Sequence, residues 1–450
     1  MIWVNTWMKE KLMPKNDHHK RLVVKFRANS AAYIPHIDHV EKHLIQNQIC
    51  NWSEVEGVAK NATLNPLIGK IGICDKLRSV AEKLKLVQSG EKRGDLSRYF
   101  VLENIEDADL VTLQAKIKAW PEVEKVEVVP TVGYPQAYLS AASEGIGALP
   151  VRVVARSMGE MVRVADIEGA WVLDHPAFGN LNLFPTGHMP WVSDPAVAEH
   201  GTNVLGVLCG SDALNQFSGI APNLERVFVV SHGGSAGGVV QAILDAGAEL
   251  LQAPPYTGII LLEAEFSKPG VAPYPCELDD YVFEAIYEVT QAGITVIEPA
   301  GNGDSNLSNH AALNPSHIDF RDSGAIVVAA GVRSPPNWKR WLGSNFGRRV
   351  DCFAAGETVR TATSGEAIYA DRFGGTSSAA AIIAGVAAVT QSMALHITGT
   401  ALQPSALRKL LQDSKFGTAS STNSEAGGGE WIGNMPDLAL IAQHLNGAVV

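Results

Sequence analysis

The chain has 450 residues, of which 46% are hydrophobic and 18% charged, and this composition excludes an intrinsically disordered protein. Its length exceeds that of one ordinary core, so we expect two domains. The formal net charge of -11 argues against nucleic acid as a partner, because phosphates would be repelled.

The first 135 residues alternate strand and helix patterns. Strands are predicted at 20–27, 98–105 and 123–130, and amphipathic helices at 75–87 and 107–120. This order predicts a small α+β domain of the ferredoxin-like kind over residues 1–135. The stretch QAYLSAASEGIGALP, residues 136–150, is rich in small and turn-forming residues. It predicts a linker over 136–155 that could contain a self-cleavage site.

After residue 155 the pattern changes to long apolar segments separated by helical runs. Strands are predicted for VRVADI, RVFVVS, GIILLEAE, ITVIEPA and AIVVAAGV. Continuous apolar strands that alternate with helices of 10–15 residues are typical of a parallel sheet covered on both faces. Residues 156–450 are therefore predicted to form a three-layer α/β domain.

The segment FGGTSSAAAIIAGVAAV, residues 373–389, brings a serine to the start of an alanine-rich helix. Ser377 there could act as a nucleophile, because the free N–H groups and partial positive charge of a helix N-terminus stabilise a developing oxyanion. The alternative for this segment alone is a serine that caps a buried helix.

Two further segments carry groups that complement such a serine. His200, in EHGTNVLGVLCG, precedes an apolar helical face and could serve as a general base. Asn302, in PAGNGDSN, follows an apolar strand and has an amide that could donate to an oxyanion. Each residue taken alone has a plainer explanation, a structural histidine or an Asn-Gly turn.

Together these segments resemble the subtilisin-like serine peptidases. Ser377 matches the Gly-Thr-Ser nucleophile motif, His200 the His-Gly-Thr motif and Asn302 the Ala-Gly-Asn motif, in the order of that family. The resemblance covers about residues 160–440. It implies a serine endopeptidase that forms an acyl-enzyme, with an oxyanion held by Asn302 and the Ser377 backbone N–H. It also implies that residues 1–135 are a propeptide-like domain that inhibits the enzyme and assists its folding.

The carboxylate that should orient His200 departs from the family pattern. The resemblance implies an aspartate seven residues before a His-Pro pair, and counting back from His175 leads to Glu168. Asp166 has the usual side chain but lies two residues earlier on the same strand. Residues two apart face the same side of a strand, so both can point toward His200. We favour Glu168 and keep Asp166 as the alternative.

Two more departures concern the substrate cleft and metal binding. The strand that should line the cleft contains Glu263 and Glu265, whose charge suggests a preference for basic or polar side chains. Ala177 stands where many relatives have an aspartate that binds calcium, so we expect no required metal and no cofactor. The five cysteines lack the spacing of a zinc site or disulfide framework.

The remaining expectations concern location and partners. The N-terminal residues lack the apolar run of a signal peptide, which predicts a cytoplasmic protein, or a secreted one if the start is misassigned. No apolar stretch of about 20 residues was found that would span a membrane. We expect a monomer whose partners are polypeptide substrates and its own N-terminal domain. The competing hypothesis is an inactive pseudo-peptidase that binds peptides.

Overall fold

The computed structural model describes 13 stretches of the chain, namely residues 21–27, 51–59, 63–66, 99–103, 109–129, 136–141, 144–152, 154–212, 217–252, 258–334, 337–365, 368–423 and 429–447. The chain divides into two compact units, a smaller one within residues 15–133 and a larger one from residue 134 onward.

The smaller unit is a four-stranded antiparallel sheet in the order β2-β3-β1-β4. Its elements are β1 (Arg21–Phe26), α3 (Ser53–Glu56), β2 (Thr63–Pro66), β3 (Tyr99–Glu103), α5 (Leu110–Lys118) and β4 (Val123–Val129). One helix lies between the first two strands in the chain and one between the last two. This order of elements and strands is that of a ferredoxin-like βαββαβ unit. The helix predicted at 75–87 lies outside the described residues.

The larger unit is built on a mainly parallel sheet in the order β19-β20-β16-β14-β13-β10-β5-β9-β6. Its strands are β5 (Arg163–Glu168), β6 (Leu183–Thr186), β9 (Arg226–Ser231), β10 (Gly258–Leu262), β13 (Thr295–Pro299), β14 (Ile326–Ser334), β15 (Asn337–Arg340), β16 (Cys352–Ala355), β19 (Gly417–Ala419) and β20 (Asn434–Pro436). Only β15 and β19 pair antiparallel to a neighbour.

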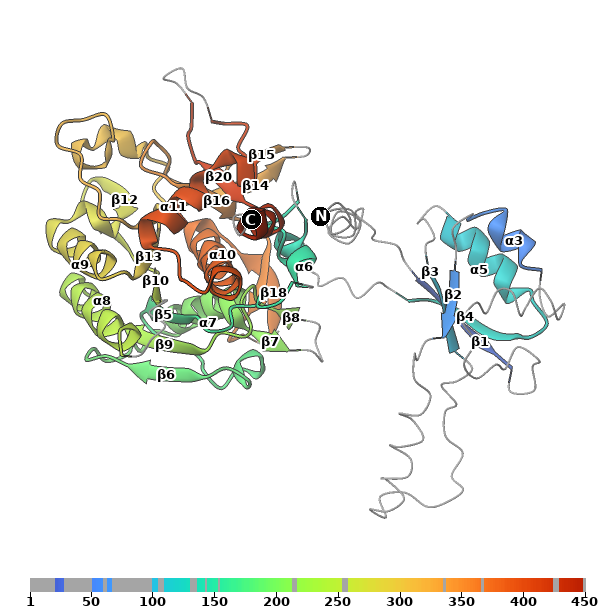
Figure 1. Ribbon diagram of the computed structural model, residues 1–450. Coiled ribbons are helices and arrows are strands. Elements are labelled where there is room, and N and C mark those ends of the chain that lie inside the picture. Colours follow the sequence, from blue (N-terminus) through green and yellow to red (C-terminus); the bar gives the residue numbers. More distant parts are fainter. Residues whose placement is uncertain are drawn as a thin grey trace, which may run out of the picture. The chain divides into compact units, whose positions relative to one another are not determined.

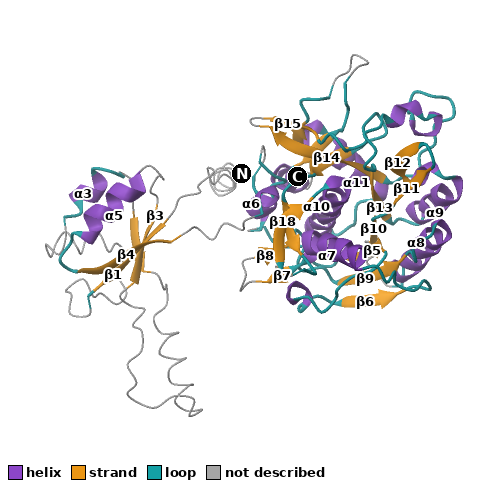
Figure 2. Ribbon diagram, turned by 180° about the vertical axis from the view of Figure 1, so that it is seen from behind, coloured by secondary structure: helices purple, strands orange, loops and turns teal. Residues whose placement is uncertain are grey.

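Helices cover both faces of this sheet, which gives the predicted three layers (Figures 1 and 2). The helices are α6 (Ala148–Val151), α7 (Pro195–Cys209), α8 (Ala236–Leu250), α9 (Asp280–Gln291), α10 (Gly375–Thr398), α11 (Pro404–Gln412) and α12 (Leu438–Gly447). On one face α8 and α9 pack together, and on the other α10 packs against α7 and α12.

Short elements border the sheet. They are the hairpins β7 (Ser211–Asp212) with β8 (Phe217–Ser218), β11 (Glu265–Lys268) with β12 (Val271–Pro275), and β17 (Val359–Ala362) with β18 (Tyr369–Phe373), and the 3-10 turns η3 (Ala137–Leu139), η4 (Pro176–Phe178), η5 (Cys276–Leu278), η6 (Leu307–Asn309), η7 (Ala311–Leu313) and η8 (Ser414–Phe416).

The central strands of this sheet are mainly apolar because both of their faces are buried. In β10, Ile259 and Leu261 belong to the core beside α10, whereas Ile260 and Leu262 belong to the core beside α8 and α9. The alternation of side chains along a strand produces this division. It also predicts which layer a polar residue at the end of the strand will face.

The segment predicted to be a linker differs from that expectation. Of the described residues there, Tyr138, Leu139 and Ile146 are buried in the core of the larger unit. Gln136 is also buried and both donates to and accepts from the backbone of Ser218. The composition of small residues, which suggested flexibility, instead permits close packing.

Helix α10 corrects the expectation that the chain has no apolar stretch of about 20 residues. It has 24 residues and is the one helix among the described residues that is long and apolar enough to cross a membrane. Within its most apolar window, 89% of the residues are buried in the protein. This burial identifies α10 as the central helix of the core.

Candidate active site

Two buried carboxylates lie at the carboxyl end of β5, a central strand of the sheet. Asp166 is fully buried and Glu168 is 2% exposed. Val164, on the same side of the strand, packs in the core beside α7 and α10. Because side chains alternate, the two carboxylates face that same layer.

His200 lies on α7, which delivers its ring to Glu168. The helix starts after Asp194, whose side chain accepts a hydrogen bond from the Ala196 N–H at 2.8 Å. His200 Nδ1 lies 2.6 Å from Glu168 Oε1. Burial lowers the pKa of His200, but the Glu168 carboxylate raises it, and the net pKa is above the ordinary value. Glu168 thus orients the ring and favours its protonated form.

Asp166 has a different partner. It accepts a hydrogen bond from the Trp171 indole N–H at 2.8 Å, and its other oxygen is buried with no hydrogen bond. Burial, followed by the charge of Glu168, raises its pKa well above the ordinary value. Of the two carboxylates considered for His200, Glu168 contacts the ring, whereas Asp166 is hydrogen-bonded to Trp171.

Ser377 lies in the first turn of α10, next to a second serine. Ser378 is buried and donates to the carbonyls of Ala355 and Gly375, so its hydroxyl is engaged in the fold. Ser377 is only partly buried. The Phe373 ring, four residues earlier, packs edge-on against the His200 ring with centroids 5.7 Å apart. The end of β18, two residues before α10 begins, therefore lies against His200.

Asn302 is joined to the same turn. Its Oδ1 accepts from the backbone N–H of Thr376 at 3.0 Å and from the Thr376 hydroxyl at 3.1 Å. Gly375 has a φ of 75°, and a Cβ there would lie 2.9 Å from Asn302 Oδ1. A glycine is required at this point for conformation and for space. The Asn302 amide is thereby fixed beside the residue that precedes Ser377.

Two of the three N–H donors of Asn302 are engaged by one carboxylate. Its backbone N–H and its Nδ2 donate to the same oxygen, Glu265 Oε2, at 2.8 and 3.0 Å. The sequence predicts Glu265 near the substrate cleft but does not predict its contact with Asn302, the expected oxyanion donor. This contact depends on where β11 folds after β10, and no local pattern indicates it.

Glu263 is more buried than Glu265, with 5% of its surface exposed, and neither of its carboxylate oxygens has a hydrogen-bond partner in the described part of the chain. Burial raises its pKa well above the ordinary value, Glu168 and Asp166 raise it further, and the Ser377 hydroxyl lowers it. Glu263 continues the face of β10 that carries Leu261, so the strand alternation could have placed it toward His200 and Ser377.

Glu168, His200 and Glu263 are also the candidate ligands for a metal. Each offers one ligand atom within 4.8 Å of the others. However, His200 Nδ1 is already engaged by Glu168, and the raised pKa of Glu263 favours a bound proton. A neutral acid beside an ion pair accounts for the cluster without a cation.

A cavity of about 620 Å³ opens onto these residues. His200, Glu168, Glu263 and Glu265 line it, with Lys268 and Tyr274 of the β11–β12 hairpin. The segment His232–Ala236, a tight turn between β9 and α8, forms another wall. The cavity is large enough for a side chain or two of a peptide.

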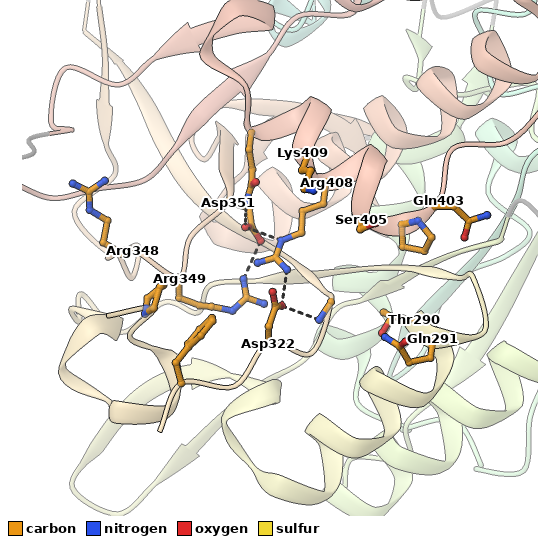
Figure 3. A pocket seen from close by; sticks show the side chains of 15 residues that line it. Thr290, Gln291, Asp322, Arg348, Arg349, Asp351, Gln403, Ser405, Arg408 and Lys409 are labelled. Atoms are coloured by element: carbon orange, nitrogen blue, oxygen red, sulfur yellow. Dashed lines mark hydrogen bonds and ion pairs between the residues drawn. The ribbon is translucent and has the colours of Figure 1, made fainter. Parts of the chain in front are cut away.

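A second cavity, of about 630 Å³, lies away from these residues and is lined by charged groups (Figure 3). Arg349 pairs with Asp351 at 3.0 Å, and Arg408 pairs with both Asp351 and Asp322. Arg349 also pairs with Glu277, and both side chains are fully buried. Arg349 and Arg408 are thus both paired with carboxylates, which indicates a network with a structural role.

Two curated proteases match part of the chain. The "Extracellular protease" of Xanthomonas campestris pv. campestris is 28% identical over 260 residues, 55% of this chain and 40% of that protein. The "Alkaline extracellular protease" of Yarrowia lipolytica is 33% identical over 140 residues, 30% of this chain and 28% of that protein. The matches thus span less than half the length of either relative.

Among solved structures, a cold adapted subtilisin-like serine proteinase is 22% identical and covers 62% of this chain and 89% of its own, with a TM-score of 0.45. The self-cleaved protease domain of PatA is 21% identical and covers 64% of this chain and 98% of its own, with a TM-score of 0.47.

The family model described as "Subtilase family" (Peptidase_S8) matches residues 185–430. This range includes His200, Asn302 and Ser377 but begins after β5, where the carboxylate departs from the family pattern. The match covers more than half of the chain, and the protein therefore belongs to the subtilase family.

Proposed function

We propose that this protein is a serine endopeptidase in which Ser377 is the nucleophile, His200 the general base and Asn302 an oxyanion donor. The observation that carries the proposal is the 2.6 Å contact between His200 Nδ1 and Glu168 Oε1. The same ring packs against Phe373, four residues before Ser377. An imidazole held by a carboxylate beside a serine is the arrangement that nucleophilic acyl transfer requires.

In the proposed reaction, His200 accepts the proton of Ser377 while the serine oxygen attacks a peptide carbonyl. The protonated ring then gives this proton to the leaving amine. In the second step His200 takes a proton from a water molecule that attacks the acyl group, and it returns the proton to Ser377 as the acyl group leaves. Glu168 stabilises the ring in its protonated state. Its extra methylene, compared with an aspartate, accounts for the reach from the end of β5 to His200.

The experiment is labelling of Ser377 with a fluorophosphonate, followed by mass spectrometry of the modified peptide. The wild-type protein should be labelled and Ser377→Ala should not. Ser392→Ala is the matched control, because it removes a buried hydroxyl of the same helix whose hydrogen bond goes to Glu160. A folded wild-type protein that resists labelling would favour the pseudo-peptidase, for which no specific observation speaks.

The smaller unit is proposed to be an inhibitory, propeptide-like domain, and its ferredoxin-like order of strands agrees with this role. Residues 136–151 pack into the larger unit wherever they are described, so a self-cleavage site is better sought before residue 136. The intact mass of the purified wild-type protein, beside that of Ser377→Ala, tests this. Loss of about 15 kDa in the wild type alone would support cleavage there.

The expected partners are polypeptide substrates and the chain's own N-terminal unit, and a monomer remains the proposed state. The cytoplasmic location expected from the sequence has no support from the comparisons. Both matched relatives are named extracellular proteases, which favours secretion for this protein. Detection of the protein in culture medium and in cell lysate would distinguish the two locations.

A further inference from the structure

Glu265 holds both donors of Asn302 through a single carboxylate oxygen. The carbonyl end of the Asn302 amide is fixed by the two donors of Thr376, so the amide cannot turn over without breaking those bonds. The Nδ2 group must therefore face Glu265 in this state. A negatively charged oxygen thus holds one of the two N–H donors of the amide that the proposed reaction needs, and its charge opposes an oxyanion at the other.

This contact can be opened. Glu265 is exposed and lies at the start of β11, in a two-stranded hairpin that borders the cavity. Hydrogen bonds of exposed groups exchange readily with water, so the side chain can swing away from Asn302 without disturbing the core.

Once displaced, Glu265 would find the neighbouring cationic groups already paired. His200, whose pKa the charge of Glu265 helps to raise, is held by Glu168. The nearest candidate on its strand, Lys268, lies 2.5 Å from Asp279 and is neutralised by that pair. Glu265 forms no ion pair with another residue in the described part of the chain. An uncharged substrate would leave this carboxylate unpaired, whereas a cationic side chain in the cavity would pair with it.

We propose that Glu265 is a specificity-determining residue that blocks Asn302 until a positively charged side chain of the substrate draws its carboxylate away. We call the Glu265–Asn302 contact the carboxylate gate. Recognition of an arginine or lysine is thereby coupled to formation of the oxyanion hole. This inference rests on the proposed function. It concerns when the Asn302 amide is free to bind an oxyanion, and not which residue is the nucleophile.

The carboxylate gate predicts opposite effects of Glu265 on neutral and charged substrates. We would compare peptides with one arginine, or its uncharged isostere citrulline, at each position around the scissile bond. Wild type should prefer the arginine peptide at one position, chiefly in kcat, because a bound citrulline peptide would leave the Glu265–Asn302 contact in place. In Glu265→Ala the citrulline peptide should gain about 10-fold in kcat/KM, and the preference should disappear.

Glu265→Asp separates two effects of Glu265, its contact with Asn302 and its attraction for a cationic side chain. Its carboxylate is one methylene shorter and cannot reach both donors of Asn302, but it still attracts a cation. This variant should gain on the citrulline peptide and keep the arginine preference. Glu288→Gln, which removes an exposed carboxylate from α9, is the control and should match the wild type.

Labelling by an uncharged fluorophosphonate tests the gate without a peptide. Glu265→Ala should be labelled at Ser377 about 10-fold faster than wild type. Labelling of wild type that Glu265→Ala does not accelerate would overturn the gate and leave the peptidase intact. Equal losses on both peptides in Glu265→Ala would also overturn it. No labelling of Ser377 in any folded variant would refute the proposed function and this inference with it.

Discussion

At the scale of single residues, the site is defined by which polar group touches which. Glu168 contacts His200, whereas Asp166 is held by Trp171. Ser377 is partly exposed, whereas Ser378 bonds within the fold. Both pairs are neighbours in sequence with similar chemistry, and only the three-dimensional contacts assign them different tasks.

The Glu168 contact makes a direct prediction. Glu168→Gln replaces the charge that stabilises the protonated ring and should slow labelling of Ser377 on the order of 10³-fold. Asp166→Asn should slow it far less, because Asp166 has no hydrogen bond to His200 among the described residues. Labelling rates of the two variants, measured in parallel with thermal melting, would check this. Equal losses in both would contradict the assignment of Glu168.

A second prediction at this scale concerns Asn302. Asn302→Ala removes the amide donor and should lower kcat by about 10²–10³-fold with little change in KM. It also leaves the Thr376 N–H and hydroxyl without the acceptor that they have in the native protein. Steady-state kinetics on a peptide substrate would separate kcat from KM. A loss confined to KM would indicate that Asn302 binds substrate without acting on the oxyanion.

At the scale of elements, the start of α10 connects the fold to the site. Its glycine turn, Thr376 and Asn302 form one hydrogen-bonded unit, so the proposed nucleophile Ser377 and the proposed oxyanion donor are positioned together. The sequence predicted this turn and the serine that follows, because glycines before a small-residue helix have a local meaning.

Two glycines of α10 provide a matched test of that unit. Gly375 and Gly399, at opposite ends of the helix, have φ values of 75° and 74°. A Cβ at Gly399 meets nothing within 4 Å, whereas one at Gly375 would meet Asn302. Each alanine variant should be destabilised by about 1 kcal/mol from backbone strain. Only Gly375→Ala should also lose labelling of Ser377, as measured beside melting temperature. Labelling that survives in Gly375→Ala would separate the turn from the oxyanion donor.

Features set by distant parts of the chain could not be predicted. The apolar strands of the larger unit and the three layers follow from sequence periodicity, and the structure confirms them. The contact of Glu265 with Asn302 joins residues 37 positions apart, and the burial of Tyr138 depends on strands far along the chain. From local composition, Glu265 was expected only to place negative charge near the cleft, and the segment around Tyr138 was expected to be a flexible linker.

At the scale of the whole molecule, charged networks away from the site influence how the stability of the folded protein changes with pH. The cavity in Figure 3 contains Asp322, which pairs with Arg408 at 2.6 Å. Burial alone would raise the pKa of Asp322, but Arg408 lowers it to below the ordinary value. The folded state therefore binds this proton more weakly than the unfolded state does.

The sign of this shift predicts the pH dependence of stability. The contribution of Asp322 is present above the pKa of an unfolded aspartate, near 4, and is lost as the pH falls through the lower folded-state value. Asp322→Asn should lower the melting temperature by about 1–2 °C at pH 7. This difference should diminish as the pH falls below the ordinary pKa of an aspartate. A difference that stays constant with pH would show that packing, and not charge, accounts for it.

The burial of Gln136 and Tyr138 has a consequence for any break in the chain before residue 136. The new amino terminus would not be released, because Gln136 is anchored to the Ser218 backbone and the Tyr138 hydroxyl donates to the Arg360 carbonyl. The new amino terminus would stay bound to the larger unit through Gln136 and Tyr138. Cleavage would therefore break the covalent link to the smaller unit without changing the packing of the larger one.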